Sequence, residues 1–227
     1  MPRGTPRQLP HQGALVCQDW PGPSVRGPVS PDWYFSADDV GDSARLLGLI
    51  SFHFACFGAG TPCLNDFPYY DNNWGPIAPH AFLARLPQRL LAHPGGGALA
   101  VIGHVDRAWG YSFSWYAEGR TREQTVAFRD TLTALMGGQP VGHAVECFNN
   151  RHATLSAMLT GQLLDVRRGT ESDERELAGL WPANNDSRAY VVIGDPAARL
   201  MVAADAAEGT PRPELHCARS RETGSPQ

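Results

Sequence analysis

The residue best suited to do chemistry in this sequence is a cysteine at the end of its most hydrophobic stretch. Cys56 closes the run at residues 46–56 (LLGLISFHFAC), and the short, mostly small segment at residues 57–61 (FGAGT) follows it. A continuous apolar run stopped by glycines predicts a strand buried on both faces of a parallel sheet. Chemistry in such sheets gathers at the carboxyl ends of strands, so Cys56 is a candidate nucleophile.

The glycine beside Cys56 suits an oxyanion site. Gly58 would let a substrate carbonyl approach backbone N–H groups, because no side chain stands in the way. Free cysteine is also among the most buried residue types, so Cys56 has a second interpretation as a small apolar residue that ends a core strand. Spacing alone favours the second interpretation.

Two histidines are near Cys56 in the expected sheet. His53 lies three positions upstream on the same strand, where side chains point to opposite faces, so it is expected in the core or at an interface. His104 ends the next apolar run, at residues 98–105 (ALAVIGHV), and could approach the same rim or be a structural histidine. Zinc takes sulfur and imidazole ligands, but the spacing of Cys56, Cys63 and His104 matches no closed structural motif. We therefore predict no metal and no other cofactor.

The elements expected around these residues form an α/β unit. Residues 13–20 predict a short strand before the Cys56 strand. Pro79 suits the first position of a helix that runs toward His93, which Pro87 could break. The order strand, glycine-rich loop, helix, strand is a βαβ unit, for which a right-handed parallel crossover is expected.

The second half of the chain predicts two amphipathic helices and a last strand. The first helix is expected at residues 122–136 with Thr121 as its cap, and the second at residues 141–164. The apolar face of the second helix is spaced by three or four residues and comprises Val141, Val145, Phe148, Leu155 and Leu159. A short strand at residues 190–193 follows.

The domain organisation expected from these patterns has three parts. Residues 1–12 contain three prolines and predict an N-terminal loop, and residues 13–204 form one domain. Residues 205–227 are polar and without pattern, which predicts a disordered tail.

Composition limits the class of protein. The chain has 227 residues and a formal net charge of -4, which argues against general nucleic-acid binding because that needs a basic face. No apolar run has the length of a membrane span and no secretory signal is evident, so no membrane partner is expected. The five cysteines are an odd number and widely scattered, which predicts free thiols and a cytoplasmic location.

Three segments, in the same order, resemble one family of peptidases. Residues 49–61 (LISFHFACFGAGT) resemble the nucleophile strand of caspase-like cysteine peptidases, especially the gingipain-like and CHAT-domain branches. Residues 97–110 (GALAVIGHVDRAWG) resemble the following strand of gingipain-like peptidases, where an Ile-Gly core leads to a Trp-Gly loop that lines the substrate cleft. Residues 191–200 (VVIGDPAARL) resemble their Gly-Asp-Pro ending.

This resemblance implies a caspase-like three-layer α/β/α fold with a mainly parallel sheet, incomplete at the N-terminus. It also implies a cysteine endopeptidase that hydrolyses peptide bonds, with Cys56 as nucleophile and Gly58 near the oxyanion. The family places a His-Gly pair before the nucleophile strand, and no such pair precedes Cys56 here. His11, before Gln12 and Gly13, is the remaining upstream candidate for the base.

The missing pair leaves three interpretations open. The chain is an endopeptidase-like domain, inactive as it stands if its base was lost with a late start or a truncated gene. Alternatively, it is a non-catalytic caspase-like module for binding or scaffolding, or a fragment that exposes an unpaired sheet edge. The base within reach of the Cys56 sulfur distinguishes the first interpretation from the others.

The expected partner is a peptide or protein substrate. Aromatic residues 67–74 and 109–116, with Trp109 at the start of the second segment, are either substrate subsites or covering loops. Asp19 and Asp106 could pair with a basic substrate side chain, although most loop aspartates are only solvated. His104, at the same rim, completes the candidate substrate-binding residues.

Overall fold

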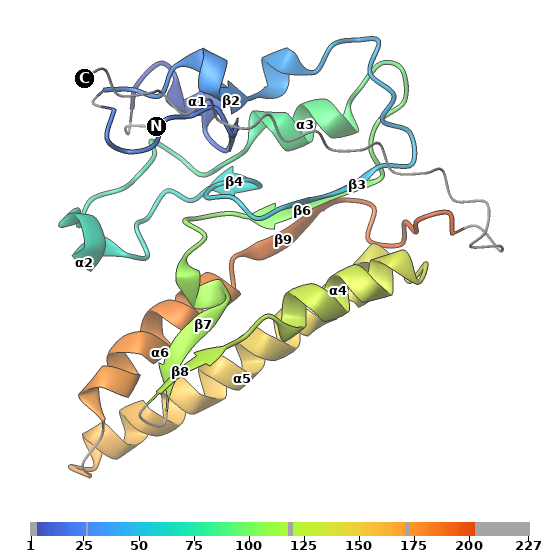
Figure 1. Ribbon diagram of the computed structural model, residues 1–227. Helices are drawn as coiled ribbons and strands as arrows, with labels where there is room; N and C mark the ends of the chain where they lie inside the picture. The colour runs from blue at the N-terminus through green and yellow to red at the C-terminus, as the bar shows by residue number, and fades with distance from the viewer. Residues whose placement is uncertain (1–3, 26, 118–119, 171–172, 203–227) are drawn as a thin grey trace, which may run out of the picture.

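A mixed three-stranded sheet lies at the centre of the protein (Figure 1). The computed structural model describes residues 4–25, 27–117, 120–170 and 173–202. The sheet has the order β3 (Ile50–His53), β6 (Ala100–His104), β9 (Tyr190–Gly194). β3 and β6 are parallel, with Ile50 opposite Ala100, whereas β9 is antiparallel to β6. The chain is therefore a mixed α/β protein.

The central strand β6 is buried on both faces because helices cover both. All of its residues are buried. Val101 packs toward α3 (Arg85–Leu91), together with Leu86 and Leu90. Ala100 and Ile102, which point to the opposite face, pack against the helices of the other layer. This alternation explains the continuous apolar run of the sequence.

The layer above the sheet in Figure 1 is assembled from short elements. It contains α1 (Gln8–His11), α3, and the antiparallel pair of β1 (Leu15–Val16) and β2 (Tyr34–Phe35). Gln8 is buried and fixes α1, because its side-chain amide donates to the Ile77 carbonyl at 2.8 Å. Residues 8–11 are thus a helical turn rather than the loop expected over residues 1–12.

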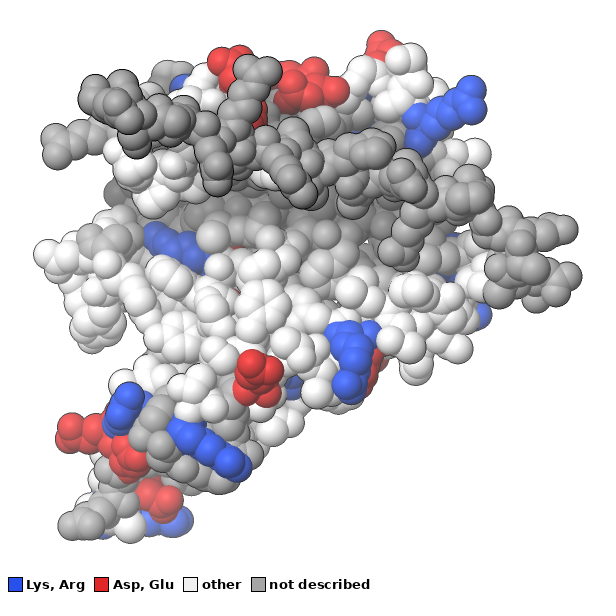
Figure 2. All heavy atoms as spheres, viewed as in Figure 1, with Lys and Arg blue, Asp and Glu red and all other residues white. Residues whose placement is uncertain are grey.

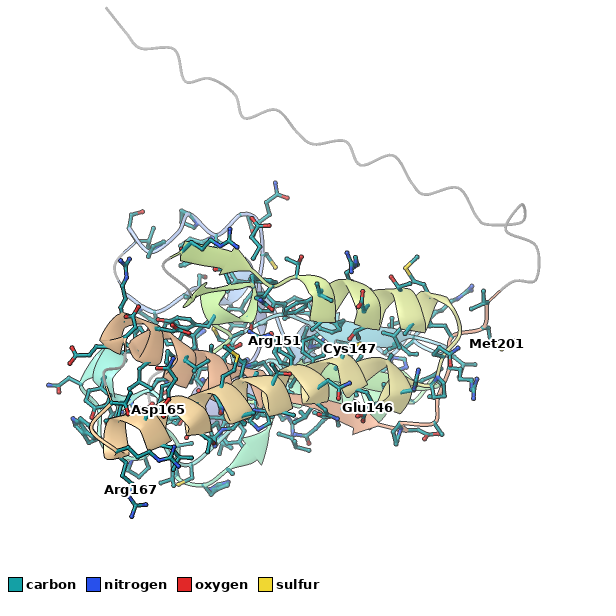
Figure 3. The ribbon with its side chains drawn as sticks, turned by 90° about the horizontal axis from the view of Figure 1, so that it is seen from below. Glu146, Cys147, Arg151, Asp165, Arg167 and Met201 are labelled. Carbon is teal, nitrogen blue, oxygen red and sulfur yellow. The ribbon has the colours of Figure 1, made fainter. Side chains whose placement is uncertain are left out.

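The opposite layer consists of three longer helices. They are α4 (Val126–Met136), α5 (Val141–Arg167) and α6 (Glu174–Ser187). Figure 3 shows α4 and α5 side by side, with Arg167 at the end of α5. The buried residues of α5 recur every three or four positions and are Val141, Ala144, Phe148, Arg151 and Leu155. This spacing confirms the second predicted helix.

Smaller elements connect the layers. β4 (Gly60–Thr61) pairs with β5 (Phe82–Leu83), and β7 (Ser114–Ala117) with β8 (Arg120–Glu123), each antiparallel. The remaining short helices are α2 (Pro68–Asp71) and the 3₁₀ turns Pro31–Trp33, Ala37–Asp39 and Gly110–Ser112. In Figure 2 charged side chains of both signs lie along the top and at the lower-left end of the molecule, with a few more between these two regions.

Two predicted helix starts are wrong for the same reason, which is that strand pairing holds the preceding residues extended. β5 keeps the chain extended after Pro79, so α3 begins at Arg85. Pro87 then falls in the first turn of α3, where its missing N–H costs little. Likewise Thr121 lies in β8, and α4 begins at Val126 after Thr125.

The strand predicted at residues 46–56 is shorter and less buried than expected. Only Ile50–His53 is strand, because Gly48 has a φ of 87° and the Leu49 N–H closes a turn onto the Leu46 carbonyl at 2.9 Å. β3 is also an edge strand and only half-buried. Because β9 is antiparallel to β6, the sheet is mixed rather than mainly parallel.

Of the other predictions, two are confirmed and one concerns residues outside the described ranges. The parallel pairing of the two apolar strands and the last strand near Tyr190 are confirmed. The predicted tail at residues 205–227 lies outside the described residues. None of the helices formed by the described residues combines the length and apolar character needed to cross a membrane.

Candidate active site

Cys56 lies on an exposed, tightly held turn just after β3. Its Sγ donates a weak hydrogen bond to the Ala108 carbonyl at 3.7 Å. The next residue, Phe57, has a φ of 61°, in the left-handed region that bulky residues avoid. The Phe57 N–H donates to the Asp106 carbonyl at 2.7 Å, which holds the strained residue in place. The turn therefore presents the thiol to solvent instead of burying it.

A glycine on the segment after α1 makes direct contact with this turn. Gly13 has a φ of 84°, and a Cβ at this position would overlap the Phe57 carbonyl oxygen. Only glycine therefore permits the observed approach. Because Gly13 follows His11 by two residues, this contact places the end of α1 beside the Cys56 turn.

His11 and Cys56 line the same cavity, which has a volume of about 740 Å³. The Nδ1 atom of His11 lies 4.0 Å from Oδ2 of Asp38, and the imidazole packs beside the ring of Tyr34 at 5.7 Å between centroids. Within the described residues, this Nδ1 is buried and makes no hydrogen bond. The Nδ1 edge of the imidazole ring is thus the edge near the Asp38 carboxylate, and Nε2 is on the opposite edge of the ring.

A second cavity reaches Cys56 from the side of the sheet. Its volume is about 570 Å³, and it lies between residues 14–16 and residues 52–56. Ala14, Val16 and Cys56 line both cavities. The thiol is therefore placed where two hollows meet, with the β1 segment between them.

Backbone N–H groups near Gly58 are the candidate donors for an oxyanion. The Gly58 N–H donates to the Ala55 carbonyl at 3.0 Å, so it would have to leave this bond to bind a substrate. In the described part of the chain, the Cys56 N–H makes no hydrogen bond. The position of Gly58 beside an oxyanion stays a prediction, and the Cys56 amide is a second candidate donor.

His53 is a core histidine, as predicted. It is buried, with Nε2 2.7 Å from the Ser51 hydroxyl and Nδ1 3.4 Å from the Gly58 carbonyl oxygen. Burial lowers the pKa of His53, with a smaller opposing contribution from the Gly58 carbonyl. Its contact with the Gly58 carbonyl connects β3 to the turn that carries Cys56.

His104 is fully buried rather than exposed at the rim. Nδ1 lies 2.8 Å from the Asp106 carbonyl oxygen, and Nε2 lies 3.0 Å from the Asp186 carbonyl oxygen. Both ring nitrogens are thus occupied, and His104 lines neither cavity at Cys56. The structure supports the structural interpretation of this histidine. Of the other two, His11 lines the first cavity at Cys56, and the buried His53 lines the second.

Asp186 organises a buried polar network that sequence reasoning missed. Its carboxylate accepts hydrogen bonds from the Ser112 hydroxyl at 2.5 Å and from the Trp109 N–H at 2.9 Å. The Tyr190 hydroxyl lies 2.8 Å from that of Ser112, and burial raises the pKa of Tyr190 well above its usual range. Asp186 is on α6, whose glycine, proline and asparagines gave no helical signal.

The other predicted substrate residues lie away from the two cavities. The Trp109 ring packs against Tyr70 and Phe67, with centroids 4.5 Å and 5.5 Å away. Burial, together with the hydrogen bond between the Tyr70 and Tyr111 hydroxyls, raises the pKa of Tyr70 to about 12. Asp19 is exposed on the loop after β1. None of these side chains lines a cavity at Cys56, so their substrate roles stay predictions.

Asp106 is buried under the turn instead of facing solvent. It accepts hydrogen bonds from the backbone and side chain of Arg107, at 2.6 Å and 3.4 Å. Burial raises its pKa despite this opposing contact. Among the described residues, no three histidine, cysteine or acidic side chains are grouped so that they could hold a metal ion.

Comparison with known proteins adds no relative. No family model matches this chain, and no match occurs among the curated proteins or the solved structures.

Proposed function

We propose that this chain is a thiol-dependent hydrolase that cleaves peptide bonds, with Cys56 as nucleophile and His11 as its base. The observation that supports this proposal is the shared cavity: an exposed thiol on a strained turn and an imidazole beside a carboxylate open into the same space. Reactive cysteines occupy partly exposed sites with an imidazole nearby. The resemblance to caspase-like peptidases supports the same reaction.

The proposed reaction has two stages. His11 Nε2 takes the proton of the Cys56 thiol, and Sγ attacks the peptide carbonyl carbon. The Cys56 N–H stabilises the oxyanion, the C–N bond breaks, and the imidazolium gives its proton to the amine that leaves. Water then attacks the thioester with the same imidazole as base, which releases the acid and restores the thiol.

Asp38 is the residue proposed to orient the imidazole. Its Oδ2 lies on the Nδ1 side of His11, and a proton on Nδ1 would leave Nε2 free to act as base. Rotation of the exposed Asp38 side chain would shorten the 4.0 Å separation in the complex. Catalytic hydrogen bonds are often long in the absence of substrate and tighten in the complex.

A non-catalytic peptide-binding module is the second candidate. One observation favours it: among the described hydrogen bonds, Cys56 Sγ donates to the Ala108 carbonyl and none joins it to His11. A thiol held in this way would line a binding site without attacking its ligand.

Hydrolysis of a peptide pool separates the two candidates. The full chain is incubated with a mixture of synthetic peptides, and new amino termini are counted by mass spectrometry. We expect cleavage by the wild type and by Cys17→Ala, and none by Cys56→Ala. Cys17 is the matched control because its exposed Sγ also donates one weak bond to a carbonyl, that of Leu15 at 3.8 Å. Equal yields from the wild type and Cys56→Ala would overturn the hydrolase and favour the module.

A further inference from the structure

The outer edge of β3 carries backbone groups without partners. β3 pairs with β6 on one side only, and the Leu99 N–H donates to the Leu49 carbonyl at 2.8 Å. Because backbone groups alternate along a strand, those of Ile50, Phe52 and Phe54 point away from β6. In the described part of the chain, this edge makes no hydrogen bond. Unpaired edge groups are a template for another strand.

The second cavity at Cys56 runs along this edge. It is lined by β1 with Ala14, by residues 52–56 and by Ala108. Its lining contains no aspartate, glutamate, lysine or arginine. The space is therefore suited to a neutral segment with small or apolar side chains.

We propose that this groove binds an extended peptide by strand addition to the outer edge of β3, so that the bound chain passes Cys56. The backbone bonds of Ile50, Phe52 and Phe54 would supply the affinity, and the apolar walls would select the side chains. β3 has four residues, so it would pair with a segment about 13 Å long. This inference concerns binding, and only the fate of the bound peptide rests on the proposed hydrolase.

The other wall of the groove decides the kind of occupant. The β1 segment stands across the cavity from β3. Residues of β1 bound the same cavity as the end of β3, so an occupant reaches this edge only by entering the cavity, whereas a second copy of this chain would have to bring its own sheet there. The occupant is therefore an extended peptide segment and not a second sheet.

Binding is measured on the full chain with Cys56→Ala, so that no cleavage occurs. The probe is fluorescein-labelled Val-Thr-Val-Ala-Val-Thr amide, followed by fluorescence anisotropy. Two further probes carry N-methyl groups at the odd or at the even residues, which removes the donors of one edge at a time. We expect saturable binding that one of the two methylated probes loses by about tenfold or more, because several backbone bonds disappear together.

The position of the site is tested by amide exchange and by a pair of filling variants. Bound probe should slow deuterium exchange at the outward N–H groups of Phe52 and Phe54. Ala108→Phe, added to the Cys56→Ala chain, should abolish binding. Ala81→Phe should not, because Ala81 lines a separate cavity beside β5.

The outcomes separate binding from hydrolysis. Absent binding, equal binding of all three probes, or protection elsewhere without protection of β3 would overturn the edge site, whatever the peptide pool shows. Binding that depends on N-methylation and is blocked by Ala108→Phe would support the edge site, even if the wild type cleaves nothing.

Discussion

The Cys56 turn and the Asp186 network lie at the same end of the sheet but are built in opposite ways. Cys56 follows β3 and is exposed, beside two cavities. His104 ends the neighbouring strand β6 and is fully buried against Asp186, which is itself fully buried. In the network the hydroxyl of Ser112 and the carboxylate of Asp186 satisfy each other. Near the turn, the Nδ1 of His11 and the N–H of Cys56 make no hydrogen bond among the described residues.

This contrast separates the residues that hold the fold from those that are proposed to do chemistry. A buried polar group is stable only when it is hydrogen-bonded, so the Asp186 network resists change and cannot take up a substrate. Polar groups that lack a hydrogen-bond partner and lie next to a cavity are free to bind a substrate. The same end of the sheet thus carries a fully bonded support and, beside it, the surface proposed to be reactive. Each prediction below changes one of the two.

The largest expected effect is the loss of the Asp186 carboxylate. Asp186→Ala would leave the Ser112 hydroxyl and the Trp109 N–H without their buried acceptor. The free energy of unfolding should fall by about 3–5 kcal/mol, as for other broken buried networks. Urea denaturation followed by circular dichroism measures the change. Asp19→Ala, on an exposed loop, is the control and should cost less than about 0.5 kcal/mol.

The next effect tests the contact that joins the two segments of the candidate site. Gly13→Ala would place a methyl group on the Phe57 carbonyl oxygen, at a φ of 84°. We expect a loss of about 1–3 kcal/mol in the free energy of unfolding. Gly22→Ala is the matched control, since Gly22 has a φ of 92° but open space around it. Equal losses in the two variants would mean that backbone strain, and not the contact with Phe57, is responsible.

The support for the site was more predictable from sequence than the site itself. The apolar runs at β3 and β6 and the three-or-four spacing of α5 each report burial directly, because burial selects apolar side chains. The same signal did not show that β3 ends at His53 rather than at Cys56, or that the cysteine is exposed, since spacing alone favoured a cysteine in the core. It also did not show that His11 lies near this turn, which depends on the long-range approach of Gly13 to Phe57.

The polar network was invisible for a physical reason. Its carboxylate comes from α6, where Pro182 lies inside the helix and asparagines follow. Such residues favour turns in isolation, and tertiary packing overrides that preference here. For the same reason the sequence left His104 open between the rim and a structural role: no local pattern shows that α6 covers the end of β6.

A smaller effect concerns the reactivity of the thiol. If His11 acts on Cys56, His11→Gln should slow the alkylation of Cys56 by iodoacetamide at neutral pH by about tenfold, because less thiolate forms without the base. Mass spectrometry of the alkylated peptides gives the rate, and Cys17 in the same chain is the internal reference. Unchanged Cys56 alkylation in His11→Gln would show that the shared cavity does not couple the two side chains.

The smallest effect connects the turn to pH through His53. Burial lowers the pKa of His53 below its ordinary value of 6.5, so the folded state binds fewer protons than the unfolded state near that pH. The free energy of unfolding should therefore rise with pH through this range. The contribution from neutral His53 should be lost as the pH falls below about 6.5. Urea denaturation from about pH 7.5 to about pH 5.5 measures the slope, which should flatten in His53→Gln. The exposed His143→Gln should keep the wild-type slope, and an unchanged slope in His53→Gln would mean that other groups carry the pH dependence.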